Sequence, residues 1–401
     1  MKHGYTVLLI ILTAFLSFVS SVAQPLQHAA PGFMNMDPAH LLAVDSLVSD
    51  AIDSGLTPGA VLIVVRDSLI VHREAYGWMQ KKPEMREMHI NTIFDLASLT
   101  KPLATGVAIM KLVEDGHIRL TDPISKYVPQ FARFGGTELP LREQPRIIHL
   151  LTHTAGLPSY APVRQLEELY GPDAGDSLMT WVCALPYRAA PGTDLTYSCP
   201  SFITLQQVVE EVTGMDLATW TRLHIYEPLG MLETYFLPNV ALLDRIAPTV
   251  YSEDQGVIAG IVHDPLAREV MNGISGNAGL FSTADDLAIF AAMMLNDGAI
   301  NGTRILSPAA VRTMTSVPAG YESFGRALGW DLSSAFASNK GDLFGERTYG
   351  HTGYTGTSMV LDPDTRTAVI LLTNRVYPDD STSVVDLRAK VANVVAASIL
   401  K

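Results

Sequence analysis

The most constraining feature of this 401-residue sequence is that β-strand patterns lie near both ends, with a long helical middle between them. Residues 59–65 and 69–76 are rich in β-branched residues and are separated by the turn Asp67–Ser68, which predicts a hairpin. The strand-like segments of the last third are residues 347–350, 357–361 and 367–373. Strands from both ends with helices between them favour one antiparallel sheet assembled from the two ends of the chain.

Apolar residues at helical spacing predict helices around this sheet. Asp37 and Pro38 fit the start of a first helix, which Gly55 ends. The helical period recurs in residues 203–212, 284–295 and 384–400. We therefore expect an α+β fold with helices flanking the sheet and an all-helical domain inserted in the middle. The expected division is residues 24–97 and 306–401 for the two parts of the α/β domain, and residues 98–305 for the mainly helical domain.

Composition excludes some classes of partner. Hydrophobic residues make up 48% of the chain and charged residues 17%, so a sizeable core is expected. The net charge is −13 and no run of Lys or Arg occurs, which argues against nucleic acid and against an anionic membrane surface. Cys183 and Cys199 are too few for a disulfide scaffold and lack zinc-site spacing, so two free thiols are expected.

The first 23 residues have the pattern of a signal peptide. A basic tip, Met1–His3, precedes the apolar run 7–19 and the small residues 21–23. We expect cleavage after Ala23 and a periplasmic or extracellular protein with no membrane attachment afterwards. An uncleaved anchor is the alternative, although the apolar run is short for a membrane span.

The segment Phe94–Pro102 carries a serine and a lysine three residues apart, Ser98 and Lys101. On a helix these positions share a face, with Ser98 suited to the N-cap near the positive end of the helix dipole. An amine in a dry site titrates below its free value and can act as a base, so the pair could form a Ser–Lys nucleophile. By itself the spacing fits a helix cap and a surface lysine equally well, and residues 398–401 repeat it where nothing follows to build a site.

The order of three motifs resolves this ambiguity. After Ser98 and Lys101 come Tyr197-Ser198-Cys199 and then His351-Thr352-Gly353. In this order they resemble the penicillin-recognising serine hydrolases: class C β-lactamases, D-Ala-D-Ala carboxypeptidases and β-lactamase-fold esterases. The likeness covers roughly residues 35–400 and implies a β-lactamase/transpeptidase-like fold. Supporting phrases are residues 150–157, 276–283 and 350–357.

The resemblance implies roles for the polar residues of these motifs. Ser98 would attack a carbonyl and form an acyl-enzyme that water cleaves, and Lys101 would be its base or proton relay. Tyr197 would be the second base and carry the proton to the leaving group, helped by a nearby cation such as Lys101. Which of Lys101 and Tyr197 takes the first proton stays open.

The resemblance also implies a substrate-binding edge on the third motif. The oxyanion would be held by the backbone N–H groups of Ser98 and Tyr354. Thr352 would lie beside the substrate, and Gly353 and Gly356 would let it approach the strand edge closely.

Two residues depart from the family pattern. His351 stands where the lactamases and carboxypeptidases usually carry Lys, and Cys199 stands where they usually carry Asn. A histidine is mostly neutral at pH 7 unless an acid raises its pKa, and a thiol is a poor hydrogen-bonding group. Both changes weaken recognition of an anionic, amide-bearing substrate. They favour an esterase or an unusual peptidase over an efficient β-lactamase.

We therefore expect an exported serine hydrolase that acts on a small-molecule or peptidoglycan-like ester or amide, with no metal and no cofactor. The alternative is a catalytically silent protein of the same fold that binds cell-wall fragments. No Gly-x-Ser-x-Gly, His-Glu-x-x-His or phosphate-loop motif points to another enzyme class. His153 is expected to be structural, and His263–Asp264 to order a loop near the site. Oligomeric state does not follow from the sequence.

Overall fold

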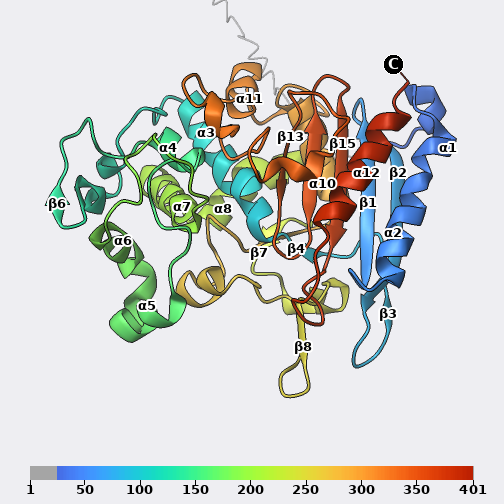
Figure 1. Cartoon of the computed structure of the whole chain (residues 1–401), viewed down its shortest axis with the longest axis horizontal. Coiled ribbons are helices and arrows are strands. Elements are labelled where there is room, and N and C mark those ends of the chain that lie inside the picture. Colours follow the sequence, from blue (N-terminus) through green and yellow to red (C-terminus); the bar gives the residue numbers. More distant parts are fainter. Residues whose placement is uncertain (1–24, 401) are drawn as a thin grey trace, which may run out of the picture.

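The computed structural model describes residues 25–400, so the predicted signal peptide lies outside the described residues. Its main feature is a six-stranded sheet with the strand order β13-β14-β15-β1-β2-β3, in which neighbouring strands are antiparallel (Figure 1). The strands are β1 Gly59–Arg66, β2 Leu69–Gln80, β3 Arg86–Glu87, β13 Tyr349–Thr352, β14 Ser358–Asp362 and β15 Thr367–Thr373. The predicted α+β class, with a sheet built from both ends of the chain, is confirmed.

The two ends of the chain meet where β1 pairs with β15, with Ile63 opposite Ile370 and Val64 opposite Val369. Every residue of both strands is buried, because both faces of the sheet are covered. Alternate side chains of β1 enter different cores: Ile63 packs in the large core and Val64 in a smaller one. A one-residue slip of register would exchange these two sets, so burial on both faces specifies the register.

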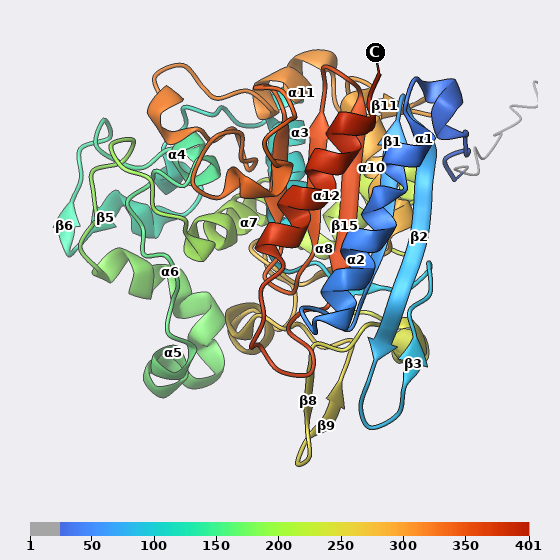
Figure 2. The ribbon, with the colours of Figure 1, turned by 45° about the vertical axis from the view of Figure 1, so that its right-hand side comes forward.

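Helices cover the two faces of the sheet. On one face lie α2 Ala43–Asp53 and α12 Val385–Ser398, which run side by side across the sheet (Figure 2). They bury the apolar side chains of Val44, Val48, Val391 and Val395 against it. The other face packs against α10 Ala284–Leu295, whose bounds match the prediction.

The middle of the chain is mainly helical and lies beside the sheet, to the left in Figure 1. Its helices are α3 Val107–Glu114, α4 Ile147–Leu151, α5 Val163–Tyr170, α6 Ala174–Ala184, α7 Cys199–Thr213, α8 Leu217–Thr221, α9 Glu227–Leu229 and, beyond α10, α11 Pro308–Met314; α1 Pro38–Leu41 precedes α2. A small sheet has the strand order β4-β10-β7. It pairs β4 Phe94–Asp95, which comes just before Ser98, with β10 Leu280–Ser282, and β10 with β7 Tyr235–Phe236. The predicted domain boundaries stay a prediction.

The segment that carries Ser98 differs from the single capped helix that we expected. Residues Ala97–Leu99 form a 3₁₀ turn and Lys101–Gly106 a π-helical turn before α3 begins. Ser98 therefore does not cap a helix. Ala97 adopts a left-handed φ of 45°, an unfavourable conformation for a residue with a Cβ. It is held there because Asp95 Oδ1 accepts the Ala97 amide hydrogen at 2.8 Å and Thr100 Oγ1 donates to the Ala97 carbonyl at 2.7 Å.

No helix within residues 25–400 is long and apolar enough to cross a membrane.

Candidate active site

Ser98 and Lys101 are in direct contact. Lys101 Nζ donates to Ser98 Oγ at 2.9 Å and to the carbonyl of Asn277 at 3.0 Å, and the lysine side chain is fully buried. Ser98 itself is half-buried and faces two cavities. The turn Ala97–Leu99 thus holds a hydroxyl at a surface opening with an amine directly behind it.

The charge state of Lys101 differs from the expectation. Burial lowers its pKa, but neighbouring Cys199, Tyr197 and Asp264 outweigh burial, and the pKa is raised above its usual value. At neutral pH Lys101 is an ammonium group. It can donate a hydrogen bond to Ser98 Oγ, but it is not free to accept the first proton.

Tyr197 lies beside this pair in the loop before α7. Its ring stacks on His153 with 4.3 Å between centroids, and Lys101 Nζ lies 4.9 Å from the centroid of the tyrosine ring. His153 Nδ1 accepts the backbone hydrogen of Ser198 at 3.0 Å, which holds the loop in place. This arrangement agrees with the structural role predicted for His153.

The third motif ends strand β13. His351 is 2% exposed, and its Nδ1 lies 2.9 Å from the carbonyl of Thr352, to which it donates. Burial, together with the positive charges of Arg326 and Lys101, holds the pKa of His351 well below its usual value. The hydrogen bond to the Thr352 carbonyl acts in the opposite direction but does not outweigh burial and these charges, so His351 is neutral at physiological pH.

Arg326 is the residue of this region that the sequence analysis missed. It is fully buried, its Nη1 pairs with Asp331 at 2.6 Å, and its guanidinium carbon lies 5.5 Å from the centroid of the Tyr197 ring. Its Nε and Nη2 have no hydrogen-bond partner within the described part of the chain. Arg326 therefore places a permanent cation behind Tyr197 and His351, although no motif marks it in the sequence.

Close packing within the protein also requires the glycines at positions 353 and 356. A Cβ on Gly353 would lie 2.3 Å from the carbonyl oxygen of Leu96, and a Cβ on Gly356, whose φ is +120°, would lie 2.0 Å from Thr373 Oγ1. Gly353 lets the end of β13 pack against the segment before Ser98, and Gly356 lets the following turn pack against β15. This packing fixes the position of Tyr354 relative to Ser98.

The two backbone amides expected to hold an oxyanion are unengaged. Neither the Ser98 nor the Tyr354 N–H donates a hydrogen bond to any acceptor in residues 25–400. The Tyr354 side chain is 57% exposed, and its hydroxyl donates to Asp380. The site thus has two free amide donors near the mouth of the pocket that contains Ser98 and Tyr197.

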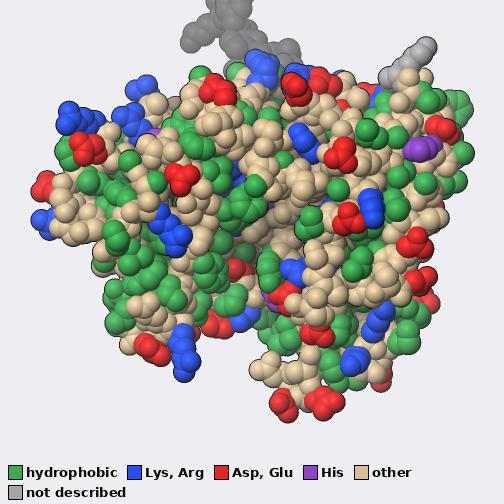
Figure 3. Space-filling model, viewed as in Figure 1, with side chains coloured by type: hydrophobic (Ala, Val, Ile, Leu, Met, Phe, Trp, Pro, Cys, Tyr) green, Lys and Arg blue, Asp and Glu red, His purple; other side chains and the backbone are tan. Residues whose placement is uncertain are grey.

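Two cavities meet at Ser98, and Tyr197 and Tyr354 line both. The arginine-side cavity, of about 300 Å³, is bounded by His351, Arg375 and Arg388. The Asp264-side cavity, of about 640 Å³, is bounded by Tyr160, Cys199, His263 and Asp264. In Figure 3 the surface is hollowed between the helical part at the left and the sheet part at the right.

Cys199 begins α7 and faces the Asp264-side cavity. Cys183 and Cys199 are both buried and form no disulfide, as predicted. Burial raises the pKa of the Cys199 thiol, and the positive charge of Lys101 acts in the opposite direction. The thiol presents a small, weakly polar group to the cavity.

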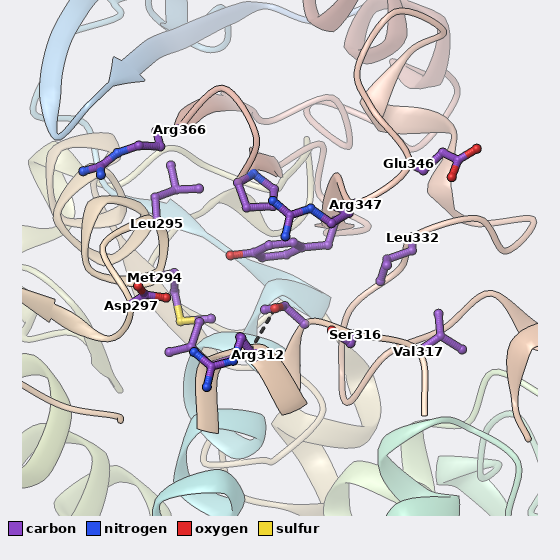
Figure 4. Close-up of a pocket in the computed structure, with 14 residues that line it drawn as sticks. Met294, Leu295, Asp297, Arg312, Ser316, Val317, Leu332, Glu346, Arg347 and Arg366 are labelled. Atoms are coloured by element: carbon purple, nitrogen blue, oxygen red, sulfur yellow. Dashed lines mark hydrogen bonds between the residues drawn. The ribbon is translucent and has the colours of Figure 1, made fainter. Parts of the chain in front are cut away.

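A further cavity, of about 660 Å³, lies between α10, α11 and the loop after β14, and Figure 4 shows its lining, which includes Arg312, Arg347 and Arg366. Arg347 and Arg366 are paired with Asp364 and Asp67. None of the predicted site residues lines this cavity. It is therefore separate from the candidate active site.

A buried lysine bonded to a serine at the junction of a sheet and a helical region is typical of one class of serine hydrolases. A family model described as "Beta-lactamase" matches residues 44–393, and this chain belongs to the β-lactamase family. A protein from Escherichia coli O157:H7 named "Putative D-alanyl-D-alanine carboxypeptidase" is 32% identical over 396 residues, covering 92% of this chain and 90% of that protein. The "N-acetylmuramyl-L-alanine amidase" of Bacillus subtilis (strain 168) is 33% identical over 362 residues, covering 84% and 81%.

Solved structures share the fold. "EstCE1, a hydrolase with promiscuous acyltransferase activity" has a TM-score of 0.71 at 22% identity, covering 89% of this chain and 99% of that one. A penicillin-binding protein homologue from Caulobacter crescentus has a TM-score of 0.69 at 18% identity, covering 90% and 98%. The predicted family and the β-lactamase/transpeptidase-like fold are confirmed, and the chain is a serine hydrolase of that fold.

Proposed function

We propose that this protein is an exported hydrolase that cleaves an ester or amide through an acyl-enzyme on Ser98. The observation that carries the proposal is the 2.9 Å contact between Lys101 Nζ and Ser98 Oγ at the junction of two cavities. A buried ammonium group bound to a hydroxyl stabilises negative charge on that oxygen. Residues 25–400 therefore contain a serine poised as a nucleophile.

Tyr197 is assigned as the first base. Lys101 is already a hydrogen-bond donor to Ser98 Oγ, whereas Lys101 Nζ and the Arg326 guanidinium carbon lie 4.9 and 5.5 Å from the centroid of the Tyr197 ring. Ser98 Oγ bonds to the substrate carbonyl carbon as its proton passes to Tyr197. The amides of Ser98 and Tyr354 hold the oxyanion. Tyr197 then returns the proton to the leaving group, and water hydrolyses the acyl-enzyme to release the acid and restore Ser98.

The substrate class that we propose is a small ester or a peptidoglycan-like amide. The names of two relatives refer to D-alanyl-D-alanine and to N-acetylmuramyl-L-alanine. His351 supplies no charge for a carboxylate, but Arg388 is still a cation beside the arginine-side cavity, although burial lowers its pKa to about 9. A substrate carboxylate therefore remains compatible with this site despite the missing lysine. Export is supported by the signal-peptide pattern of residues 1–23.

The test is to measure initial rates of the purified protein on p-nitrophenyl acetate, nitrocefin and a D-Ala-D-Ala peptide, together with labelling by a fluorophosphonate. Turnover of at least one substrate, with the label on Ser98, is the expected result. Ester turnover above nitrocefin turnover is expected as well, because of His351 and Cys199. A folded protein that turns over none of them and takes no label would instead be the catalytically silent binder.

A further inference from the structure

Asp264 is a carboxylate of the Asp264-side cavity that the mechanism above does not use. Its Oδ1 accepts the amide hydrogen of Ala267 at 2.8 Å and lies 3.4 Å from Asn277 Nδ2. Its Oδ2 has a single, long contact, 3.4 Å from the hydroxyl of Tyr160. An ionised carboxylate oxygen can accept two hydrogen bonds, so Oδ2 keeps unused acceptor capacity.

The cations and other charges around this cavity leave Asp264 without an ionic partner. Arg268 is engaged elsewhere: it donates to the carbonyls of Val262 and His263 at 2.9 and 3.0 Å and pairs with Glu269 at 2.7 Å. The cavity's other carboxylate, Asp380, is paired with Arg375. Within residues 25–400, Asp264 forms no ion pair at 4 Å or less.

Asp264 is also close to the reacting groups. Its negative charge is among the causes that raise the pKa of Lys101, and it also acts to raise the pKa of the buried Cys199 thiol. Lys101 cannot serve as its salt-bridge partner, because Lys101 Nζ is bonded to Ser98 Oγ and to the Asn277 carbonyl. The unpaired carboxylate therefore lies in the cavity next to the nucleophile, where part of a bound substrate must lie.

The rest of the lining suits a cation. Three tyrosine rings, those of Tyr160, Tyr197 and Tyr354, bound the cavity together with the apolar residues Val250 and Pro265. An ammonium group is attracted both to aromatic faces and to a carboxylate, and it is stabilised most where the two occur together away from bulk water. The carboxylate of a substrate bound in this cavity would be repelled by Asp264. The arginine-side cavity has the opposite preference.

We propose that the acyl part of the substrate carries an ammonium group that binds Asp264, so that the substrates are esters or amides of amino acids or peptides with a free amine. The amine donates to Asp264 Oδ2, and its positive charge lies among the tyrosine rings. This inference rests on the proposed hydrolase activity and adds to it the chemical class of the acyl group.

The test compares alanine methyl ester, as both enantiomers, with methyl isobutyrate, in which a methyl group replaces the ammonium group at nearly constant shape. At a pH where the amine is protonated, kcat/KM for one alanine enantiomer should exceed that for methyl isobutyrate by about tenfold or more. Asp264→Asn keeps the oxygen that accepts from Ala267 but removes the charge. In this variant the ratio should fall by about tenfold or more, to the value that the electron-withdrawing ammonium group sets by itself.

The matched control is Glu253→Gln, which removes an exposed carboxylate that lies outside the cavity lining. It should leave the ratio at its wild-type value. Turnover of both esters with the same ratio in wild type and in Asp264→Asn overturns the inference while the proposed hydrolase function stands. If neither ester nor p-nitrophenyl acetate is cleaved and Ser98 takes no fluorophosphonate, the proposed function fails and this inference fails with it.

Discussion

The two cavities that meet at Ser98 differ in charge although they share the same nucleophile. The arginine side is built from the end of β13 and from α12, and its cations are Arg375 and Arg388. Its carboxylate, Asp331, is paired with the buried Arg326. The Asp264 side is built from loops of the middle of the chain, and its unpaired charge is a carboxylate. Because the two cavities differ in charge, we expect a substrate with opposite charges at its two ends to bind across Ser98 in one orientation only.

Removing Ser98 should have the largest effect, because a substrate bound in either cavity reacts with this nucleophile. Ser98→Ala should lower kcat/KM by roughly 10³–10⁶-fold for substrates of either charge. The fold should persist, because Ser98 caps no helix. Steady-state kinetics and the melting temperature check this, with Ser49→Ala, on the exposed face of α2, as the control. Hydrolysis retained by a folded Ser98→Ala protein would refute the acyl-enzyme.

Removing the proton path should have the next largest effect. Tyr197→Phe and Lys101→Met should each lower kcat/KM by roughly 10²–10⁴-fold, by a similar factor for cationic and anionic substrates, because both residues serve the shared nucleophile. The double variant should lose much less than the product of the two losses. Lys111→Met, on the exposed face of α3, is the control. Losses that multiply cleanly would show that the two residues act independently.

Adding a cation to the arginine side tests how much a further positive charge there lowers the stability of the fold. A lysine in place of His351 would be buried beside Arg326 and Lys101, and the carboxylate of this cavity, Asp331, is already paired with Arg326. His351→Lys should lower the free energy of unfolding by about 2–5 kcal/mol relative to His351→Gln. Adding Arg326→Met should recover part of the loss. Denaturant unfolding measures each value, and a His351→Lys protein as stable as His351→Gln would show that Arg326 does not fill this role.

The smallest effect concerns the buried carboxyl group of Asp95, which binds two segments of the Asp264 side. Asp95 accepts the amide hydrogens of Ala97 at 2.8 Å and of His263 at 2.7 Å, and burial raises its pKa to about 6. Because this pKa is raised in the folded state, the contribution of Asp95 to stability is largest at low pH and falls as pH rises through about 4 to 6.

An asparagine at position 95 has one acceptor oxygen for these two amides, so Asp95→Asn should cost about 1–3 kcal/mol. The stability difference between wild type and Asp95→Asn should narrow as pH rises from 4 to 7. Urea unfolding at several pH values measures it. A difference that is constant over this range would show that Asp95 keeps the same charge throughout.

The pH dependence of activity tests the charge of His351 on the arginine side. Because the pKa of His351 is well below its usual value, activity on carboxylate-bearing substrates should not rise as pH falls through 6.5. The sequence alone left a charged His351 open, since an acidic neighbour would have raised its pKa. The structure supplies two cations as neighbours instead.

Features set by neighbouring residues were predictable from the sequence. The bounds of β15 and α10 match the predicted segments because strand alternation and helical periodicity are local. The contact between Ser98 and Lys101 was predictable for the same reason, since the two are three residues apart. The assembly of one sheet from both ends followed from the order of the elements.

The charges of the site were decided by tertiary structure. We expected burial to lower the pKa of Lys101, but Asp264, which is far away in sequence, helps to raise it. Arg326 and Asp264 carry no local signal because their roles depend on what packs beside them. A side chain's propensity belongs to its own segment, whereas its burial and the charges it faces belong to every segment that the fold brings to it. The sequence by itself thus determined the nucleophile's segment and the sheet, and only the fold decided which groups around them are charged.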